Sequence, residues 1–147
     1  MRELSLSASL AEWTWLRKLR RAMIRPGRDR LAGIVEVDET YIGGPEQGMR
    51  WRETESKAIV VAAAEKNGSG IGRIRLQRVL DVSDGSLISL IREAVASGSS
   101  VHTDAWTGYS GLMKAGYLHH VAVISRDTKL AQDLMPRVHI LASLLKQ

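Results

Sequence analysis

Cysteine is absent from this chain of 147 residues. Its absence excludes disulfide bonds, and it also excludes any zinc or iron–sulfur site that uses cysteine ligands of this chain. Long apolar segments are missing as well, because runs such as residues 58–64 are far too short to cross a bilayer. The first residues contain no continuous apolar stretch, so we expect no signal peptide. These absences fit a protein of a reducing compartment with no membrane partner.

The composition is otherwise ordinary for a globular protein, with 44% hydrophobic and 25% charged residues. A chain of this length fits one domain that buries a core. The sequence contains no internal repeat and no low-complexity segment. We therefore expect one globular unit, preceded by a short N-terminal stretch of different character.

That N-terminal stretch carries much of the net charge of +5. Between positions 17 and 30 the only acid is Asp29, and arginine outnumbers lysine. The guanidinium group suits bidentate contacts with phosphate. The run is either a nucleic-acid-binding surface or the solvated face of a helix. The basic residues are Arg17, Lys18, Arg20, Arg21, Arg25, Arg28 and Arg30.

Hydrophobic periodicity predicts the order of the elements. A helix over residues 10–23 precedes a strand over 34–44, and two further strands within 57–81 are joined by a hairpin turn at Asn67-Gly68. A helix with Ser83 as its N-cap follows, then a short strand ending in Asp104, a short helix or turn over 107–116, a strand over 117–124, and a helix from Met135 onward. This order predicts an α/β fold with a mixed sheet covered by helices.

Two aspartates stand in or at the end of predicted strands. Adjacent strand residues point to opposite faces, so either Asp38 or Glu39 must face inward or line a cleft. If the first strand lies beside the fourth, Asp38 and Asp104 converge at one edge of a cleft. Mg²⁺ is typically held by one or two carboxylates plus substrate phosphate, and paired ions assist phosphoryl transfer. The alternative is that each aspartate caps a turn or a helix start.

The last segment adds a histidine and a lysine. His139 and Lys146 are seven residues apart, which on a helix places both on one face, two turns from each other. Ser143 lies between them on that face. These residues are either functional or simply a structural histidine and a solvated lysine.

Three segments, GIVEVDETYIGG, VHTDAWTGY and PRVHILASLLK, together resemble the catalytic domain of bacterial insertion-sequence transposases of the DDE type. The resemblance is to the ISXO-type subgroup, whose signature is two Asp, a third residue that varies among Glu, Asn and His, and a following Lys. The Arg-rich segment before the first strand is also similar to this subgroup. The resemblance extends over about residues 13–146.

The resemblance implies a ribonuclease-H-like fold, in which a three-strand antiparallel meander is followed by alternating helices and strands. Residues 1–31 would be the basic remnant of a DNA-binding region, and residues 32–147 the catalytic domain. Members of the family usually carry a longer N-terminal region and continue beyond the lysine, so we expect a chain truncated at both ends. In that case Lys146 is not firmly positioned, because helix ends fray.

The resemblance also implies the chemistry. Asp38 and Asp104 match the two catalytic aspartates, His139 the variable third position and Lys146 the following lysine. Asp38, Asp104 and His139 would hold Mg²⁺ or Mn²⁺ for cleavage and strand transfer at insertion-sequence ends, and Lys146 would contact DNA. Glu39 would point to the other face and be structural or support the ligands.

The implied partners are terminal-repeat and target DNA and further copies of the chain, at the nucleoid in the bacterial cytoplasm. The main alternative is a catalytically inactive remnant that still binds DNA. A small α/β protein with an unrelated role would require the pattern to be accidental.

Overall fold

The computed structural model describes residues 14, 18, 29–43, 57–123 and 134–146. Most of the predicted helix over residues 10–23 lies outside these residues, although Thr14 and Lys18 are helical. Of the predicted DNA-binding residues, Lys18 and Arg30 are described and both are exposed. The others lie outside the described residues: Arg17, Arg20, Arg21, Arg25 and Arg28.

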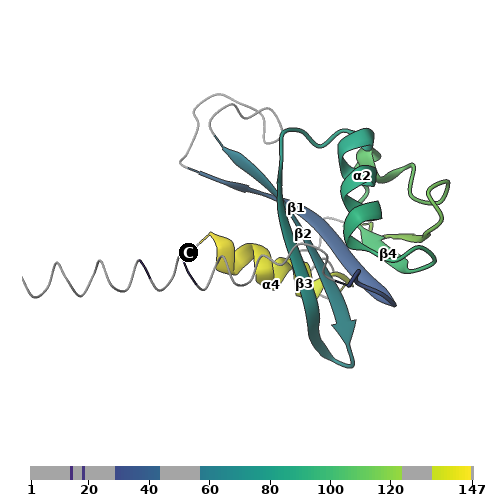
Figure 1. The fold of residues 1–147 in the computed structure, drawn as a ribbon, viewed down its shortest axis with the longest axis horizontal. Helices are drawn as coiled ribbons and strands as arrows, with labels where there is room; N and C mark the ends of the chain where they lie inside the picture. Colours follow the sequence, from purple (N-terminus) through teal and green to yellow (C-terminus); the bar gives the residue numbers. More distant parts are fainter. Residues whose placement is uncertain (1–13, 15–17, 19–28, 44–56, 124–133, 147) are drawn as a thin grey trace, which may run out of the picture.

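The described chain forms a five-stranded sheet in the order β3-β2-β1-β4-β5 (Figure 1). β1 (Ile34–Ile42), β2 (Ala58–Asn67) and β3 (Gly70–Val79) form an antiparallel meander. β4 (Ser100–Thr103) runs parallel to β1, and β5 (Leu118–Val121) runs parallel to β4. This topology confirms the predicted α/β class, with a meander followed by alternating helices and strands, and is compatible with a ribonuclease-H-like domain.

Local signals in the sequence account for the turn and the first described long helix. Gly68 has φ +57° in the turn between β2 and β3, a conformation that glycine adopts without strain, so the Asn67-Gly68 hairpin is confirmed. The helix α2 (Asp84–Ala94) begins at its predicted N-cap, where the Ser83 side chain accepts a hydrogen bond from the Ser86 N–H. The short 3-10 helix η1 (Thr107–Tyr109) packs beside α2.

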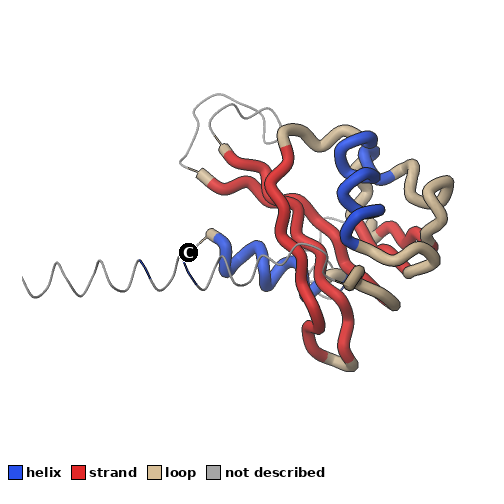
Figure 2. The backbone as a smooth tube through the Cα atoms, viewed as in Figure 1, coloured by secondary structure: helices blue, strands red, loops and turns tan. Residues whose placement is uncertain are grey.

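Two helices cover opposite faces of the sheet, as the tube in Figure 2 shows. On one face α2 and η1 bury large apolar side chains of the sheet, among them Val35 and Val37 of β1. On the other face α4 (Pro136–Leu145) packs on the small residues Ala62 and Ala64 of β2. β1 therefore lies between two cores, and its successive side chains point alternately into one and the other.

The segment that leads into β1 also belongs to the α2 core. Leu31 is fully buried, its N–H donates to the Ala94 carbonyl (2.8 Å), and its carbonyl accepts from the Ala96 N–H (2.8 Å). Leu31 thus joins the C-terminal end of α2, although the sequence grouped it with the N-terminal segment.

Candidate active site

The parallel pairing of β1 with β4 places the two aspartates. Ile34 pairs with Ser100 and Glu36 with His102, a constant offset along the chain. Continuing this register two residues further brings Asp38 level with Asp104, just beyond the last residue of β4. Paired residues of neighbouring strands point to the same face. Both aspartates therefore lie at the end of β4, and Asp38 is on the face of β1 that carries α4.

Three carboxylates meet at this point. One oxygen from each of Asp38, Glu39 and Asp104 lies within 4.8 Å of the other two. Asp38 and Asp104 are half-buried and Glu39 is buried. Carboxylate oxygens are the ligands that Mg²⁺ and Mn²⁺ prefer. The spacing is compatible with one metal ion or with a pair about 3.5–4 Å apart.

Glu39 reaches this group from the opposite face of the sheet. Its strand neighbours Val37 and Tyr41 belong to the α2 core. There the Tyr109 hydroxyl donates a hydrogen bond to Glu39 Oε2 (2.8 Å). The expected orientation toward the other face agrees with this geometry, but sequence reasoning missed that the carboxylate still reaches both aspartates. The adjacent acids in VDET and the tyrosine in TGY were the available signal.

Tyr109 is suited to hold Glu39 permanently. It is fully buried, and burial, followed by the negative charge of Glu39, raises the pKa of its hydroxyl well above the ordinary range. The hydroxyl therefore keeps its proton and remains a donor at any physiological pH. Glu39 is oriented by a residue of the second motif, so the VDET and TDAWTGY segments contact each other through this bond.

Asp104 is held by the turn that ends β4. Its Oδ1 accepts the Trp106 N–H (3.0 Å), which is the capping role considered above, and its carbonyl accepts the Thr103 hydroxyl (2.8 Å). Thr103 Oγ1 is also 2.8 Å from His119 Nε2. Burial, with a smaller effect from His120, lowers the pKa of His119. Capping of the turn and proximity to Asp38 therefore coexist in Asp104.

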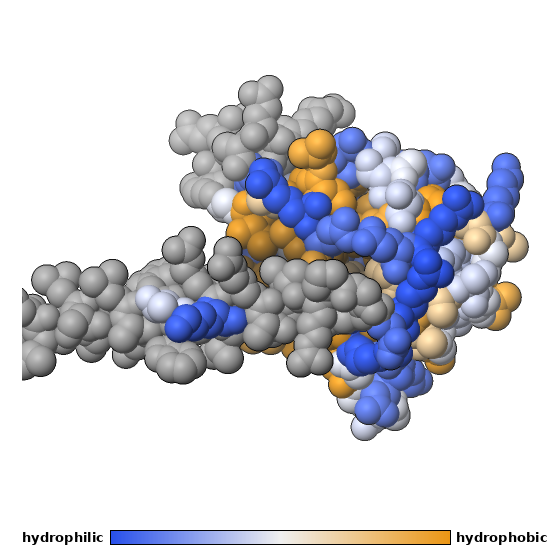
Figure 3. All heavy atoms as spheres, in the orientation of Figure 1, coloured by the Kyte–Doolittle hydropathy of each residue, from blue (hydrophilic) through white to orange (hydrophobic). Residues whose placement is uncertain are grey.

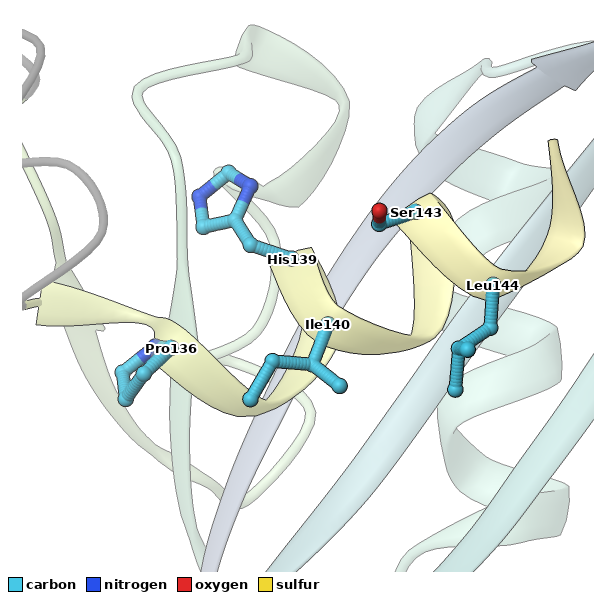
Figure 4. Close-up of a pocket in the computed structure, with 5 residues that line it drawn as sticks. All are labelled: Pro136, His139, Ile140, Ser143 and Leu144. Atoms are coloured by element: carbon cyan, nitrogen blue, oxygen red, sulfur yellow. The ribbon is translucent and has the colours of Figure 1, made fainter. Parts of the chain in front are cut away.

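His139 and Lys146 come from α4. The Nε2 atom of His139 is buried and has no hydrogen-bond partner among the described residues. His139 lines a hollow of about 400 Å³ on the surface of α4, and Figure 4 shows His139 and Ser143 projecting from one side of the helix and Ile140 and Leu144 from another. Lys146 is exposed and follows the last helical residue. Among the described residues, the group within 4.8 Å consists of the three carboxylates and includes neither His139 nor Lys146.

Arginines of β3 hold the segment that leads from the basic cluster to the sheet. Arg73 Nη2 donates to the Arg30 carbonyl (3.1 Å), and Arg75 Nη2 donates to the Asp29 carbonyl (2.6 Å). Arg73 also pairs with Glu65 (2.7 Å), and this hydrogen bond lowers the pKa of Glu65. Hydrophilic residues cover much of the described surface in the view of Figure 3, in which β3 lies toward the viewer. The backbone at Asp29 and Arg30, just before β1, is therefore bound to β3, which sequence reasoning did not predict.

Comparison with known families identifies the domain type. Residues 30–147 match the ISXO2-like transposase domain. A comparison with curated proteins gave no significant match. The matched range contains the three clustered carboxylates together with His139 and Lys146.

Proposed function

Because the chain belongs to the ISXO2-like transposase family, we propose that it carries out metal-dependent cleavage and strand transfer of DNA at insertion-sequence ends. The observation that carries the proposal is the approach of Asp38, Glu39 and Asp104 to within 4.8 Å of one another. Asp38 on β1 and Asp104 directly after β4 are far apart in the sequence, and they meet where β4 ends. Carboxylates are ligands of hard divalent cations, and paired ions about 3.5–4 Å apart assist phosphoryl transfer.

The residues present fit a divalent metal ion. All three clustered side chains offer hard oxygen ligands, which suits Mg²⁺ or Mn²⁺. The buried and unpartnered Nε2 of His139 is a further free ligand atom among the described residues. When bound, the ions would stabilise the attacking and leaving oxygens of a phosphodiester. We assign Asp38 and Asp104 as the principal ligands and His139 as the third residue of the site.

Other residues of the chain would orient these groups and the DNA. Tyr109 holds Glu39 by a hydrogen bond, and the turn at Trp106 holds Asp104. Lys146, at the end of α4, would contact the DNA backbone near the site. The basic residues Arg17, Lys18, Arg20, Arg21, Arg25, Arg28 and Arg30 would bind backbone phosphates at a distance from it. Residues 1–31 would thus serve DNA binding and residues 32–147 catalysis.

Nicking of DNA tests the proposal. The substrate is a duplex carrying insertion-sequence terminal repeats, incubated with Mg²⁺ or with a chelator. We expect Mg²⁺-dependent nicking that Asp38→Ala and Asp104→Ala abolish. The control Glu93→Ala, which removes an exposed acid of α2, should nick at the rate of the unmodified protein. Equal rates in the unmodified protein and Asp38→Ala, including no nicking in either, would overturn the enzymatic proposal. Retained DNA binding in that case would favour the inactive remnant.

DNA binding is measured separately from cleavage. Affinity should fall steeply with salt, because each phosphate neutralised by Arg or Lys releases counterions. A Lys18→Ala/Arg30→Ala variant should show a shallower salt dependence than the unmodified protein. Binding that ignores salt would count against the assignment of the basic cluster.

The cellular setting belongs to the same proposal. No helix in the described part of the chain is long and apolar enough to cross a membrane. We propose that the protein acts on DNA at the nucleoid of a bacterial cytoplasm and assembles as a homo-oligomer on paired insertion-sequence ends.

A further inference from the structure

A buried glutamate on β1 binds the start of α4. Glu36 is 2% exposed, and both of its carboxylate oxygens are used. Oε1 accepts from Arg137 Nη1 (2.7 Å), and Oε2 accepts the backbone N–H groups of Arg137 (2.8 Å) and Val138 (3.1 Å). A charge buried to this extent requires such compensation. β1 and α4 are therefore joined by a charged and directional contact.

This contact replaces a local helix cap. The N-cap residue Met135 offers no side-chain hydrogen bond, and Pro136 at the first helical position has no N–H. The next two N–H groups, which a helix start normally leaves unsatisfied, both donate to Glu36. Negative charge at a helix N-terminus is also favoured by the helix dipole. A residue on β1 thus determines where α4 can begin.

Arg137 extends the contact to a second part of the sheet. Its Nε donates to the Gly70 carbonyl (2.9 Å) and its Nη2 to the Ser69 carbonyl (3.4 Å), both at the turn between β2 and β3. The apolar contact of α4 is small by comparison, since its buried residues are Val138 and Leu141. Apolar burial has no preferred direction. The rotation and axial position of α4 therefore depend on Glu36 and Arg137.

We propose that the Glu36–Arg137 pair positions α4 so that His139 stands at the Asp38 side of the sheet, an inference that rests on the proposed function. Glu36 lies two residues before Asp38 on the same face of β1, about 7 Å away along the strand. Arg137 lies two residues before His139, about 3 Å along the helix axis. A shift of the α4 start is therefore passed directly to His139. Glu36 and Arg137 are positioning residues, because they act through His139 and not on DNA.

Distance measurement tests the placement without reference to activity. The chain has no cysteine, so Ser89→Cys on α2 and Ser143→Cys on α4, both exposed positions, accept spin labels at these two sites alone. Pulsed electron paramagnetic resonance should give one narrow distance in the parent. Arg137→Met should broaden or shift it. Arg73→Met removes another ion-paired arginine, that of Glu65, and should leave the distance unchanged. An unchanged distribution in Arg137→Met would overturn the inference.

A second variant distinguishes a displaced α4 from an unfolded protein. Arg137→Met leaves the Glu36 carboxylate buried without its cation, which is strongly destabilising. Glu36→Gln/Arg137→Met removes both charges and keeps an acceptor oxygen at position 36. We expect this double variant to remain folded by circular dichroism and still to broaden the α2–α4 distance. A parental distance in the folded double variant would also overturn the inference.

A double-mutant cycle tests whether the pair acts through His139. Glu36→Gln/Arg137→Met should slow nicking roughly 10- to 100-fold, as small misplacements of reacting groups do. In a His139→Ala background the same change should add little, because the residue being positioned is gone. If the rate reductions caused by the double variant and by His139→Ala simply multiply, the pair has a structural role only, and the positioning assignment is overturned. If the proposed function is wrong, Asp38→Ala will nick DNA at the same rate as the unmodified protein. The distance measurement still tests the placement of α4 in that case.

Discussion

The two faces of the sheet are built differently. The face under α2 buries large side chains in one continuous apolar core, including Leu87, Ile91 and Tyr109, all fully buried. The face under α4 is lined by the alanines 62 and 64, and α4 adds only a few apolar residues to it. Exposed Ile140 and Leu144 on the outer side of α4 contribute nothing to that core. The second face also holds the buried Glu36–Arg137 ion pair (2.7 Å).

The difference separates stability from placement. Apolar burial on the α2 face removes a large area from water and so supplies most of the favourable free energy of folding. A buried ion pair contributes little net stability, because desolvation offsets its Coulomb attraction, but its hydrogen bonds are directional. The three clustered carboxylates lie where β1 passes between the two faces. The face under α2 therefore stabilises the backbone of the site, and the face under α4 sets the position of His139.

A matched pair of leucines gives the largest expected effect. Leu87→Ala opens a cavity in the α2 core at a fully buried position and should lower the free energy of unfolding by about 2–5 kcal/mol. Leu141→Ala, at the less enclosed α4 face (8% exposed), should cost about 2 kcal/mol or less. Urea denaturation followed by circular dichroism measures both. Equal costs would mean that the two cores contribute alike and would break the comparison.

Glycines on the two sides provide the next test. A Cβ on Gly108 would lie 2.6 Å from the Val82 carbonyl oxygen and 2.8 Å from Leu87 Cδ1. Gly108→Ala should therefore destabilise the protein by about 1–3 kcal/mol. A Cβ on Gly70, below Arg137, would meet only the Asn67 carbonyl oxygen at 3.6 Å. Gly70→Ala should change the urea midpoint little, and a large loss there would show that the α4 side is as tightly packed as the α2 side.

The hydroxyl of Tyr109 connects the α2 core to the acids. Tyr109→Phe removes the donor to buried Glu39 and should cost about 1–2 kcal/mol of stability. It should also weaken Mn²⁺ binding measured by calorimetry, because the Glu39 carboxylate loses its orientation. Tyr117→Phe is the control, since the buried Tyr117 hydroxyl donates to the Val95 carbonyl (2.9 Å) and not to a carboxylate. If both variants alter Mn²⁺ affinity equally, the specific role of Tyr109 is wrong.

The smallest expected effect is a loss of stability at acidic pH that comes from His102, on the face of the sheet under α4. Burial, and then an electrostatic effect of His120, lowers the pKa of His102. Glu36 raises this pKa, and Lys66 and Arg137 lower it further. Since the folded-state pKa lies below the unfolded value of about 6.5, the contribution of neutral His102 is complete above that pH and is lost as the pH falls toward the folded-state pKa. The urea midpoint should therefore decrease below about pH 6.5, and less so in His102→Gln. An identical decrease in both would assign the acid sensitivity to other groups.

Local patterns explain which parts of the fold were predictable. The Asn67-Gly68 turn, the Ser83 cap and the helix after Pro136 each depend on residues within a few positions of one another, and each was found as predicted. The strand predicted to end in Asp104 ends one residue earlier, at Thr103, where Asp104 accepts the Trp106 N–H in a turn. The helix over residues 10–23 stays a prediction except at Thr14 and Lys18.

Only part of the candidate site could be predicted from local sequence patterns. Asp38 and Asp104 were identified because an acid is unusual in a strand and because both belong to recognisable motifs. Glu39 was set aside, since strand alternation correctly puts it on the other face but does not say how far its side chain reaches. The sequence carries no signal for the role of Glu36, because a glutamate in a strand usually faces water. The residue that it binds, Arg137, lies 101 positions away.

The sequence by itself determined the elements, their order and the acids that belong to the family motifs, because periodicity and turn chemistry are local. Only the tertiary structure decided that β1 lies between β2 and β4, and this neighbourhood brings Asp38 level with Asp104. It also decided that Glu39 reaches both aspartates and that Glu36 caps α4. These contacts join residues far apart along the chain, and their partners are selected by the packing of the whole sheet and its two helices.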